Sequence, residues 1–133
     1  MNPDELIQRA HEAQEQAYAP YSNYQVGAAL LCTDGSLFTG CNVENASYGL
    51  TNCAERTALF SAVAAGHSDF AALAIAAGGE TVPFPCGACR QVLSEFCGAD
   101  FPVHIATAHG ITTTTLGALL PHTFNLKPGN DDA

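Results

Sequence analysis

Three cysteines and one glutamate have residue types and a spacing that could do chemistry together. Cys53 and Glu55 lie in a Cys-Ala-Glu segment, and 33 positions after Cys53 begins a Cys-x-x-Cys segment formed by Cys86 and Cys89. Thiolates are zinc ligands, and cysteines at i and i+3 face the same side of a helix. Three protein ligands leave one tetrahedral position for water, as in catalytic zinc sites. The pattern therefore predicts a catalytic zinc.

Charged residues lie directly beside these cysteines. Glu55 can project next to the open position, where a carboxylate accepts and delivers the proton of an activated water. Three thiolates and Zn²⁺ sum to a negative charge, which makes the metal a poorer Lewis acid. Arg56 can donate hydrogen bonds to the sulfurs and restore that acidity. Because the chain has only four Lys and Arg residues, the position of Arg56 favours a role near the metal; whether Arg90 also contacts the sulfurs stays open.

Each of these residues also has an ordinary structural interpretation. The Cys-x-x-Cys pair can be a redox dithiol or two buried thiols. Glu55 can be the carboxylate of a capping box begun by Asn52, and the two arginines can be solvated helix residues. The full combination of Cys-Ala-Glu with Pro-Cys-x-x-Cys is much more specific, and it resembles the signature of zinc deaminases that act on nucleobases.

The other histidines and cysteines make a weaker case for metal binding. His104 and His109 complete a loose zinc-finger spacing with Cys86 and Cys89. A finger needs a basic helix between its ligand pairs, however, and that stretch offers only Arg90. The histidines expected on the surface or in loops are His11, His67 and His122, and the cysteines expected to pack as small hydrophobic residues are Cys32, Cys41 and Cys97.

Helices and strands must bring the cysteines together. Helices are predicted from Pro3 to before Pro20, from the Asn52 cap to Gly66, and from Cys86 to about Phe96. Each cysteine of the motif then lies at a helix N-terminus, which lowers the pKa of a thiol. Strands are predicted at residues 24–32, 37–43, 70–77, 102–106 and 111–115, with a short helical turn at 116–120. This order predicts a three-layer α/β/α sandwich around a mixed, mostly five-stranded sheet.

Length and charge exclude several classes of protein. The 133 residues predict a single domain over 1–133, with 127–133 as a loose tail. Four Lys and Arg against thirteen Asp and Glu give a net charge of −9, which argues against nucleic-acid polymers and a polybasic membrane surface. The longest apolar run, 70–77, is shorter than the ~20 residues of a membrane helix. With no signal-peptide core at the N-terminus, a cytoplasmic location is expected.

Five segments resemble the short, homotetrameric cytidine deaminases. They are YAPYSNYQVGAAL at 18–30, GCNVENASY at 40–48, NCAERTAL at 52–59, PCGACRQV at 85–92, and LLP at 119–121 followed by Phe124. Together they run from about residue 18 to residue 124. The resemblance implies that Cys53, Cys86 and Cys89 hold one Zn²⁺ per subunit, that Glu55 is the proton shuttle, and that the protein is a homotetramer.

The resemblance also implies how a nucleoside is bound. Asn42 and Glu44 would bind the ribose 3′-hydroxyl. Phe124 would reach into a neighbouring subunit's pocket, so that active sites form between chains, and Tyr48 would contribute there as well. Tyr24 departs from the pattern, because many relatives carry Phe at this pocket wall. Its ring can still pack against a pyrimidine, but its hydroxyl needs a partner or solvent.

The implied activity is hydrolytic deamination of cytidine and deoxycytidine to uridine and deoxyuridine plus ammonia, as in pyrimidine salvage. Zinc-bound hydroxide would attack C4, with Glu55 moving the protons. A blasticidin-type deaminase on the same scaffold is the nearest alternative, although the Asn42-Val43-Glu44 segment favours a nucleoside. A structural zinc module is a more distant alternative, for which Cys97 or His104 could supply the fourth ligand.

Overall fold

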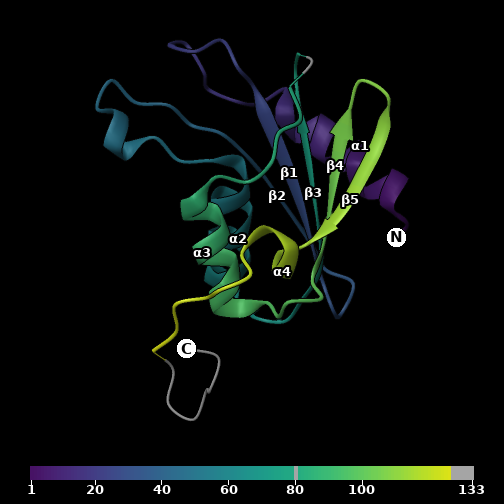
Figure 1. The fold of residues 1–133 in the computed structure, drawn as a ribbon. Coiled ribbons are helices and arrows are strands. Elements are labelled where there is room, and N and C mark those ends of the chain that lie inside the picture. Colours follow the sequence, from purple (N-terminus) through teal and green to yellow (C-terminus); the bar gives the residue numbers. More distant parts are fainter. Residues whose placement is uncertain (80, 127–133) are drawn as a thin grey trace.

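Five strands form one sheet that carries helices on both of its faces (Figure 1). A computed structural model describes residues 1–79 and 81–126; the expected tail at 127–133 lies outside the described residues. Within the described residues we find no helix with the length and hydrophobicity needed to span a bilayer. The elements are α1 (Pro3–Gln14), β1 (Val26–Cys32), β2 (Leu37–Cys41), the 3₁₀ turn η1 (Tyr48–Leu50), α2 (Ala54–Ala64), β3 (Phe70–Ala77), α3 (Gly87–Phe96), β4 (Pro102–Thr107), β5 (Gly110–Thr115) and α4 (Leu116–Leu119).

The sheet is mixed, with the strand order β2-β1-β3-β4-β5. β1 pairs antiparallel with both β2 and β3, and β4 pairs antiparallel with β5. β3 and β4 are parallel, with Ile75 opposite Ile105, and α3 lies in the connection between them. Parallel neighbours need such a crossover, whereas antiparallel ones can be joined by short turns. The predicted mixed, five-stranded sheet is confirmed.

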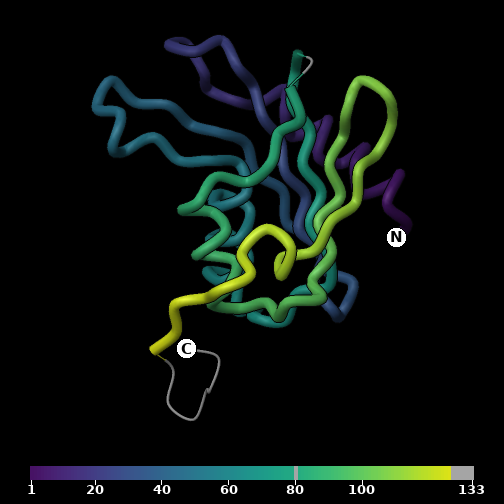
Figure 2. The backbone as a smooth tube through the Cα atoms, viewed as in Figure 1, coloured from purple at the N-terminus to yellow at the C-terminus, as the bar shows by residue number. Residues whose placement is uncertain are grey.

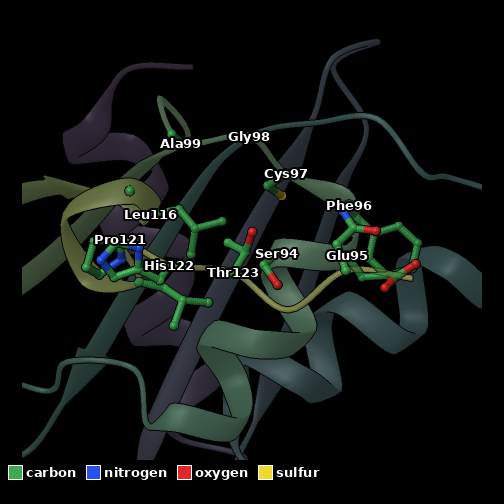
Figure 3. Close-up of a pocket in the computed structure, with 13 residues that line it drawn as sticks. Ser94, Glu95, Phe96, Cys97, Gly98, Ala99, Leu116, Pro121, His122 and Thr123 are labelled. Carbon is green, nitrogen blue, oxygen red and sulfur yellow. The ribbon is translucent and has the colours of Figure 1, made fainter. Parts of the chain in front are cut away.

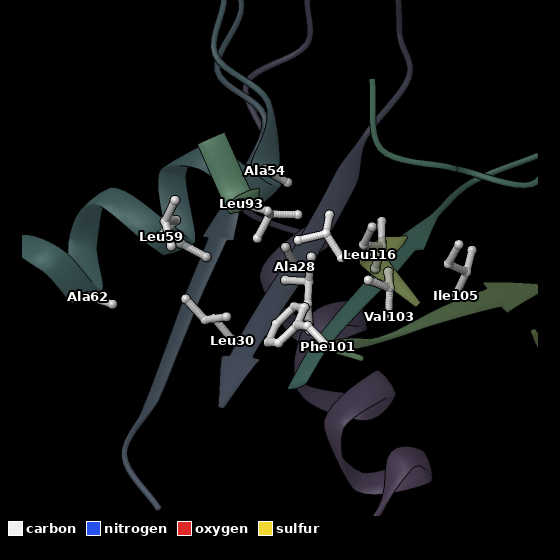
Figure 4. Close-up of a cluster of buried hydrophobic side chains, with 13 residues drawn as sticks. Ala28, Leu30, Ala54, Leu59, Ala62, Leu93, Phe101, Val103, Ile105 and Leu116 are labelled. Atoms are coloured by element: carbon white, nitrogen blue, oxygen red, sulfur yellow. The ribbon is translucent and has the colours of Figure 1, made fainter. Parts of the chain in front are cut away.

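Buried side chains on the two faces of the sheet differ in size. On one face, large residues such as Leu30, Leu73 and Val103 pack against α2 and α3 (Figure 4). On the other face, α1 packs its Leu6 and Ile7 onto a set of small residues, Ala29, Ala72, Ala74 and Ala76. Helices on both faces make three layers, as predicted. β3 is buried on both faces, which explains its continuous apolar sequence.

Two glycines let helices approach the strands closely. A Cβ at Gly27 in β1 would collide with the backbone of Ala10 and Gln14 in α1. A Cβ at Gly40 in β2 would collide with backbone atoms of Ala54 and Ala58 in α2. Only glycine fits at such contacts. Both helices are therefore held directly against strands of the sheet.

α1 ends earlier than the sequence pattern predicts. It begins as expected, with the Asn2 side chain accepting a hydrogen bond from the Glu5 N–H at 2.8 Å. It ends at Gln14 rather than just before Pro20. The Tyr18 N–H donates a hydrogen bond to the Asn42 carbonyl at 3.0 Å, and the Tyr18 carbonyl accepts one from the Glu44 N–H at 2.8 Å. The chain is therefore paired with a distant loop where the helix was expected to continue.

Two long loops leave the same end of the sheet and are joined to each other. Residues 15–25 and 42–52 both extend from this end, which is also where α2 and α3 begin (Figure 2). Isolated bridges connect Tyr18 with Val43 and Val43 with Asn52. These contacts join segments far apart in the sequence, and they place Asn42 near Cys53, in the wall of the same cavity.

Candidate active site

The three cysteines of the motif converge at the N-termini of α2 and α3. Cys53 is the N-cap residue of α2, Cys86 is the N-cap residue of α3, and Cys89 lies in the first turn of α3. Their sulfur atoms all lie within 4.8 Å of one another. The Cys53–Cys86 sulfur distance is 3.7 Å and the Cys86–Cys89 distance is 3.5 Å. Sulfurs bound tetrahedrally at a Zn–S distance of 2.3 Å lie about 3.8 Å apart, so this donor set fits zinc.

Hydrogen bonds within the cluster favour a thiolate at Cys53. The pKa of Cys53 is lowered to about 5, chiefly because the Cys89 thiol hydrogen bonds to it and also because Arg56 does. The pKa of Cys89 is raised in turn, since its thiol is held as the donor to Cys53. All six cysteines are free thiols. The cluster is therefore a set of unbridged sulfur ligands that already carries negative charge.

Arg56 extends from α2 toward this cluster. Its Nη2 donates a hydrogen bond to the Cys53 sulfur at 3.4 Å. Its Nε is buried and has no hydrogen-bond partner among the residues that the structure describes. The pKa of Arg56 is raised, first by the hydrogen bond to Cys53. A fixed cation beside the sulfurs stabilises their ionised form.

Arg90 does not share this arrangement. Its Nε donates to the Pro85 carbonyl at 2.7 Å, and its Nη1 donates to the Leu119 carbonyl at 2.8 Å. Both bonds go to the backbone, so Arg90 connects the segment before α3 to the end of α4. Arg90 therefore bonds to backbone carbonyls, whereas Arg56 bonds to a sulfur.

Glu55 is a buried carboxyl group beside the cysteines. It is the second residue of α2 and only 6% exposed. Burial raises its pKa to about 7. The capping-box interpretation is wrong, because the N-cap residue is Cys53 and the Asn52 amide donates instead to Thr57 Oγ1 at 3.1 Å. A carboxyl group that titrates near neutrality can both accept and release a proton.

A cavity of about 350 Å³ opens beside these groups. Glu55, Cys53 and Cys86 form part of its wall, and Tyr24 forms another part. The pKa of the Tyr24 phenol is raised by burial and by the charge of Glu55, so the two side chains face a common space. The size is within the range of small-molecule sites. The cavity can hold one ring-sized ligand against the carboxyl group and the sulfurs.

Other histidines and cysteines lie away from the three sulfurs. The His104 ring, on the α1 side of β4, bonds through Nδ1 to Thr113 Oγ1 at 2.9 Å. Cys97 lines a different cavity of about 530 Å³, which Ser94 and His122 also line (Figure 3). Neither side chain belongs to the three-sulfur group. The zinc-finger spacing and the structural zinc module with a fourth ligand from Cys97 or His104 are therefore not supported.

Comparison with known proteins gives a match to the same region. Residues 1–105 match the family model for the "Cytidine and deoxycytidylate deaminase zinc-binding region". This range contains all three sulfurs and Glu55, and it covers most of the chain. The chain belongs to the cytidine deaminase family.

Individual family members are similar over nearly the whole chain. A cytidine deaminase of Halalkalibacterium halodurans is 52% identical over 132 residues, which cover 98% of this chain and 100% of the relative. The cytidine deaminase of Sporosarcina psychrophila is 51% identical over 126 residues, covering 94% and 93%. The crystal structure of cytidine deaminase from Burkholderia pseudomallei superposes with a TM-score of 0.88 at 52% identity, covering 93% and 100% of the two chains. The fold is that of the family.

Asn42, one of the two residues expected to bind ribose in a cytidine deaminase, lines the 350 Å³ cavity. It follows β2 and is 9% exposed. Its Nδ2 donates to the Tyr24 carbonyl at 2.8 Å, and its Oδ1 accepts from the Val26 N–H at 2.8 Å. The Asn42 amide thus bonds the Tyr24 carbonyl and the Val26 N–H, as the backbone of a neighbouring strand would. β1 begins at Val26 rather than at the expected Tyr24. One N–H and one lone pair of the amide remain for a ligand.

Glu44, the other expected ribose-binding residue, lies in a neighbouring cavity of about 310 Å³. Its carboxylate accepts hydrogen bonds from the N–H groups of Tyr21 at 2.9 Å and Ser22 at 3.1 Å, and from the Ser22 hydroxyl. The Ser22 hydroxyl is the main reason that the pKa of Glu44 is lowered. Thr51 lines both cavities. The two residues therefore face adjoining spaces.

Tyr48 and Phe124 are exposed in the single chain. Tyr48 is 77% exposed and lines the cavity of Glu44, with its ring edge-on to Tyr21 at a centroid distance of 6.4 Å. Phe124 is 67% exposed, and its carbonyl accepts a hydrogen bond from Gln91 at 3.1 Å. Among the described residues, those that line the two cavities do not include Phe124.

The segment before α3 forms a cavity wall that sequence reasoning missed. Val82, Pro83 and Phe84 line the space beside Glu55. Phe84 is 48% exposed although it is large and apolar. The sequence contained one indication of this segment: Pro83 and Pro85 favour an extended backbone immediately before Cys86. That it lines the same cavity as Tyr24 follows from the tertiary fold.

Proposed function

We propose that this member of the cytidine deaminase family converts cytidine and deoxycytidine, with water, to uridine and deoxyuridine plus ammonia. The observation that carries the proposal is a buried carboxyl group, Glu55, with a pKa raised to about 7, placed beside three converging sulfurs on the wall of a small cavity. We take residues 1–133 as one catalytic domain. The six free thiols suit the reducing cytoplasm, which we propose as its location.

One zinc ion per subunit would be held by Cys53, Cys86 and Cys89. When bound, zinc supplies a Lewis acid that lowers the pKa of water. The hydrogen bond from Arg56 to the Cys53 sulfur would withdraw electron density from the ligand set and so counter its excess negative charge. The N-termini of α2 and α3 also favour the thiolate forms, because the positive end of a helix dipole stabilises a negative charge.

Glu55 would move the protons of the reaction. As the carboxylate it accepts a proton from the water that attacks C4 of the pyrimidine, and as the acid it delivers a proton to ring N3. Glu55 would then take the proton of the hydroxyl formed at C4 and pass it to the exocyclic amine. The C–N bond breaks, ammonia leaves, and the carbonyl of the product forms at C4. Because Glu55 is buried, it exchanges protons with bound reactants in a space with little bulk water. A pKa near neutrality suits both directions of transfer.

The remaining polar and aromatic residues would hold the nucleoside. Asn42 and Glu44, which line adjoining cavities, are proposed to bind the ribose 3′-hydroxyl, and the Tyr24 ring is proposed to pack against the pyrimidine. The two exposed aromatic residues, Tyr48 and Phe124, are proposed to complete the site between subunits of a homotetramer. The net charge of −9 disfavours a polynucleotide substrate.

The decisive experiment follows the ultraviolet absorbance of cytidine and of deoxycytidine incubated with zinc-loaded protein, with ammonia measured in parallel. Stoichiometric formation of the uracil nucleoside and ammonia is expected for both substrates. Blasticidin S and an oligonucleotide containing cytosine are tested beside them, and neither should react at a comparable rate. If zinc is bound but cytidine is not converted, the substrate assignment is wrong, and turnover of blasticidin S would replace it.

A further inference from the structure

A second group of possible metal ligands lies outside the active site. It consists of Cys32, Asp34 and His67, whose ligand atoms all lie within 4.8 Å of one another. Cys32 is the last residue of β1, Asp34 lies in the turn between β1 and β2, and His67 follows α2. Cys32 is buried, whereas the Asp34 and His67 side chains are 59% and 27% exposed. The sulfur of this group is therefore buried, whereas the carboxylate and the imidazole are accessible to solvent.

The contact between Asp34 and His67 has the length expected across a metal ion. His67 Nδ1 lies 3.6 Å from Asp34 Oδ2, which is too long for a good hydrogen bond. Nitrogen and oxygen ligands that bind one zinc ion tetrahedrally at about 2.0–2.2 Å lie about 3.4 Å apart. The other carboxylate oxygen, Oδ1, accepts the Ser36 N–H at 2.9 Å. One oxygen is thus fixed by the backbone, and the other faces the imidazole.

Backbone hydrogen bonds hold the three segments in place. In the turn, the Cys32 N–H donates to the Ser36 carbonyl at 2.8 Å. The Thr33 N–H donates to the Asp69 carbonyl at 3.0 Å, which joins this turn to the loop that carries His67. The His67 ring also packs on Phe38 at a centroid distance of 5.1 Å. Ligands fixed in this way lose little conformational freedom when a metal binds.

This group is well separated from the three active-site cysteines. Cys53 precedes α2 and His67 follows it, and a helix of 11 residues is about 16 Å long. Likewise, the active-site cavity includes Val26 at the start of β1, whereas Cys32 ends that strand. The turn between β1 and β2 lies at the opposite end of the sheet from loops 15–25 and 42–52 (Figure 1). An ion at this turn would be independent of the catalytic one.

We propose that Cys32, Asp34 and His67 form a second site for a zinc-like divalent cation, open to a water as the fourth ligand. A thiolate, an imidazole and a carboxylate are the ligands that zinc takes, whereas magnesium and calcium prefer oxygen alone. One thiolate and one carboxylate balance the charge of a divalent ion, so the site would be neutral when filled. The ion would connect the β1–β2 turn to the loop after α2.

The test titrates the full chain, with zinc already in its three-cysteine site, with Co²⁺. Equilibrium binding and the thiolate-to-cobalt absorption are measured together, and zinc retention is checked by metal analysis. One additional cobalt per chain is expected, with that absorption and a rise in Tm. Asp34→Asn and His67→Gln should each weaken this binding at least about tenfold, the lower end of what loss of even an outer-sphere partner costs. Cys32→Ala should abolish the absorption.

The matched control is Asp69→Asn, which removes the same charge from an exposed residue two positions after His67. It should bind cobalt as the unaltered protein does. The proposal is overturned if the unaltered protein takes up no additional cobalt, or if Asp34→Asn and His67→Gln bind it undiminished. It is also overturned if Asp69→Asn weakens binding as much as Asp34→Asn, since surface charge alone would then account for the uptake.

Discussion

The proposed role of Glu55 as the proton carrier depends on the burial of its carboxyl group. Removal from water raises the pKa of a carboxyl group because the charged form is the one that loses hydration. At Glu55 this effect exceeds the opposing hydrogen bonds and the nearby Arg56, and the pKa rises to about 7. Glu44, by contrast, is solvated and hydrogen bonded, and its pKa is lowered. Two glutamates near the site therefore have different protonation behaviour and different proposed roles.

Replacing Glu55 by Gln should leave zinc bound and abolish most of the turnover. The amide has nearly the same shape but cannot accept and deliver a proton, so kcat should fall by at least about 10²–10⁴-fold, the range for general acid–base catalysis. Cytidine turnover and zinc content are measured on the same preparation. Glu12→Gln, on an exposed part of α1, is the matched control and should keep full activity. Near-normal turnover of the Glu55 variant would refute the assigned role.

His104 should make stability depend on pH. It is 9% exposed, and burial lowers its pKa below the ordinary value of 6.5. The unfolded chain therefore binds this proton more readily, so the stabilising contribution is present above about pH 6.5 and is lost as pH falls through the lowered pKa. The urea midpoint at pH 7.5, 6.5 and 5.5 should fall less steeply for His104→Asn. His11→Asn, which alters an exposed histidine, should behave like the unaltered protein; identical curves for all three would contradict the prediction.

At the scale of elements, the active site depends on how closely α2 lies on the sheet. The contact is made through Gly40 in β2, where a Cβ would meet backbone atoms of α2. The same helix carries Glu55 in its first turn and begins at Cys53. A shift of the helix would therefore move the carboxyl group and one sulfur relative to Cys86 and Cys89 on α3. Packing against the strand and geometry of the site are coupled.

Gly40→Ala should reduce both stability and activity. Overpacking of a close contact typically costs about 1–3 kcal/mol, and the displaced α2 should lower zinc affinity as well. Urea unfolding and metal titration measure the two effects. Gly98→Ala is the control, because its Cβ would meet open space, and its free energy of unfolding should change by no more than about 1 kcal/mol. Equal stability of the two variants would show that α2 is not held by this contact.

At the scale of the whole molecule, the proposed binding site is incomplete in a single chain. Tyr48 and Phe124 are largely exposed, and other large apolar side chains on the surface include Leu50 and Phe60. A homotetramer with sites between chains would cover Phe124 and supply it to a neighbour.

Mixing two inactive variants tests this arrangement. Glu55→Ala removes the proton carrier, and Phe124→Ala removes the ring proposed to enter the neighbouring site. In a mixed tetramer, a Phe124→Ala subunit keeps its own Glu55 and can receive an intact Phe124 from a Glu55→Ala neighbour. Co-refolded mixtures should therefore regain part of the cytidine turnover, while each variant alone stays poorly active. No recovery in tetramers shown by mass to be mixed would rule out a site that takes Phe124 from a neighbour.

Local sequence was sufficient to predict most of the elements and to propose the metal ligands. The cysteines at i and i+3 next to a helix start, the Asn2 cap of α1 and the apolar run of β3 each depend on neighbours within a few residues. Such local preferences act in the same way wherever the segment lies. The mixed sheet, its helices on both faces and the ligands Cys53, Cys86 and Cys89 could therefore be proposed before the structure was known.

Tertiary structure decided the features that depend on distant partners. α1 stops at Gln14 because Tyr18 pairs with the 42–44 loop, and Arg90 bonds to the backbone carbonyl of Leu119 rather than to sulfur. The grouping of Cys32 with His67 joins residues that were expected to be a core thiol and a surface histidine. No spacing along the chain encodes these contacts, since their energies arise only when folding brings the segments together. The sequence by itself was enough to propose the three cysteines as metal ligands; the fold determined what surrounds them.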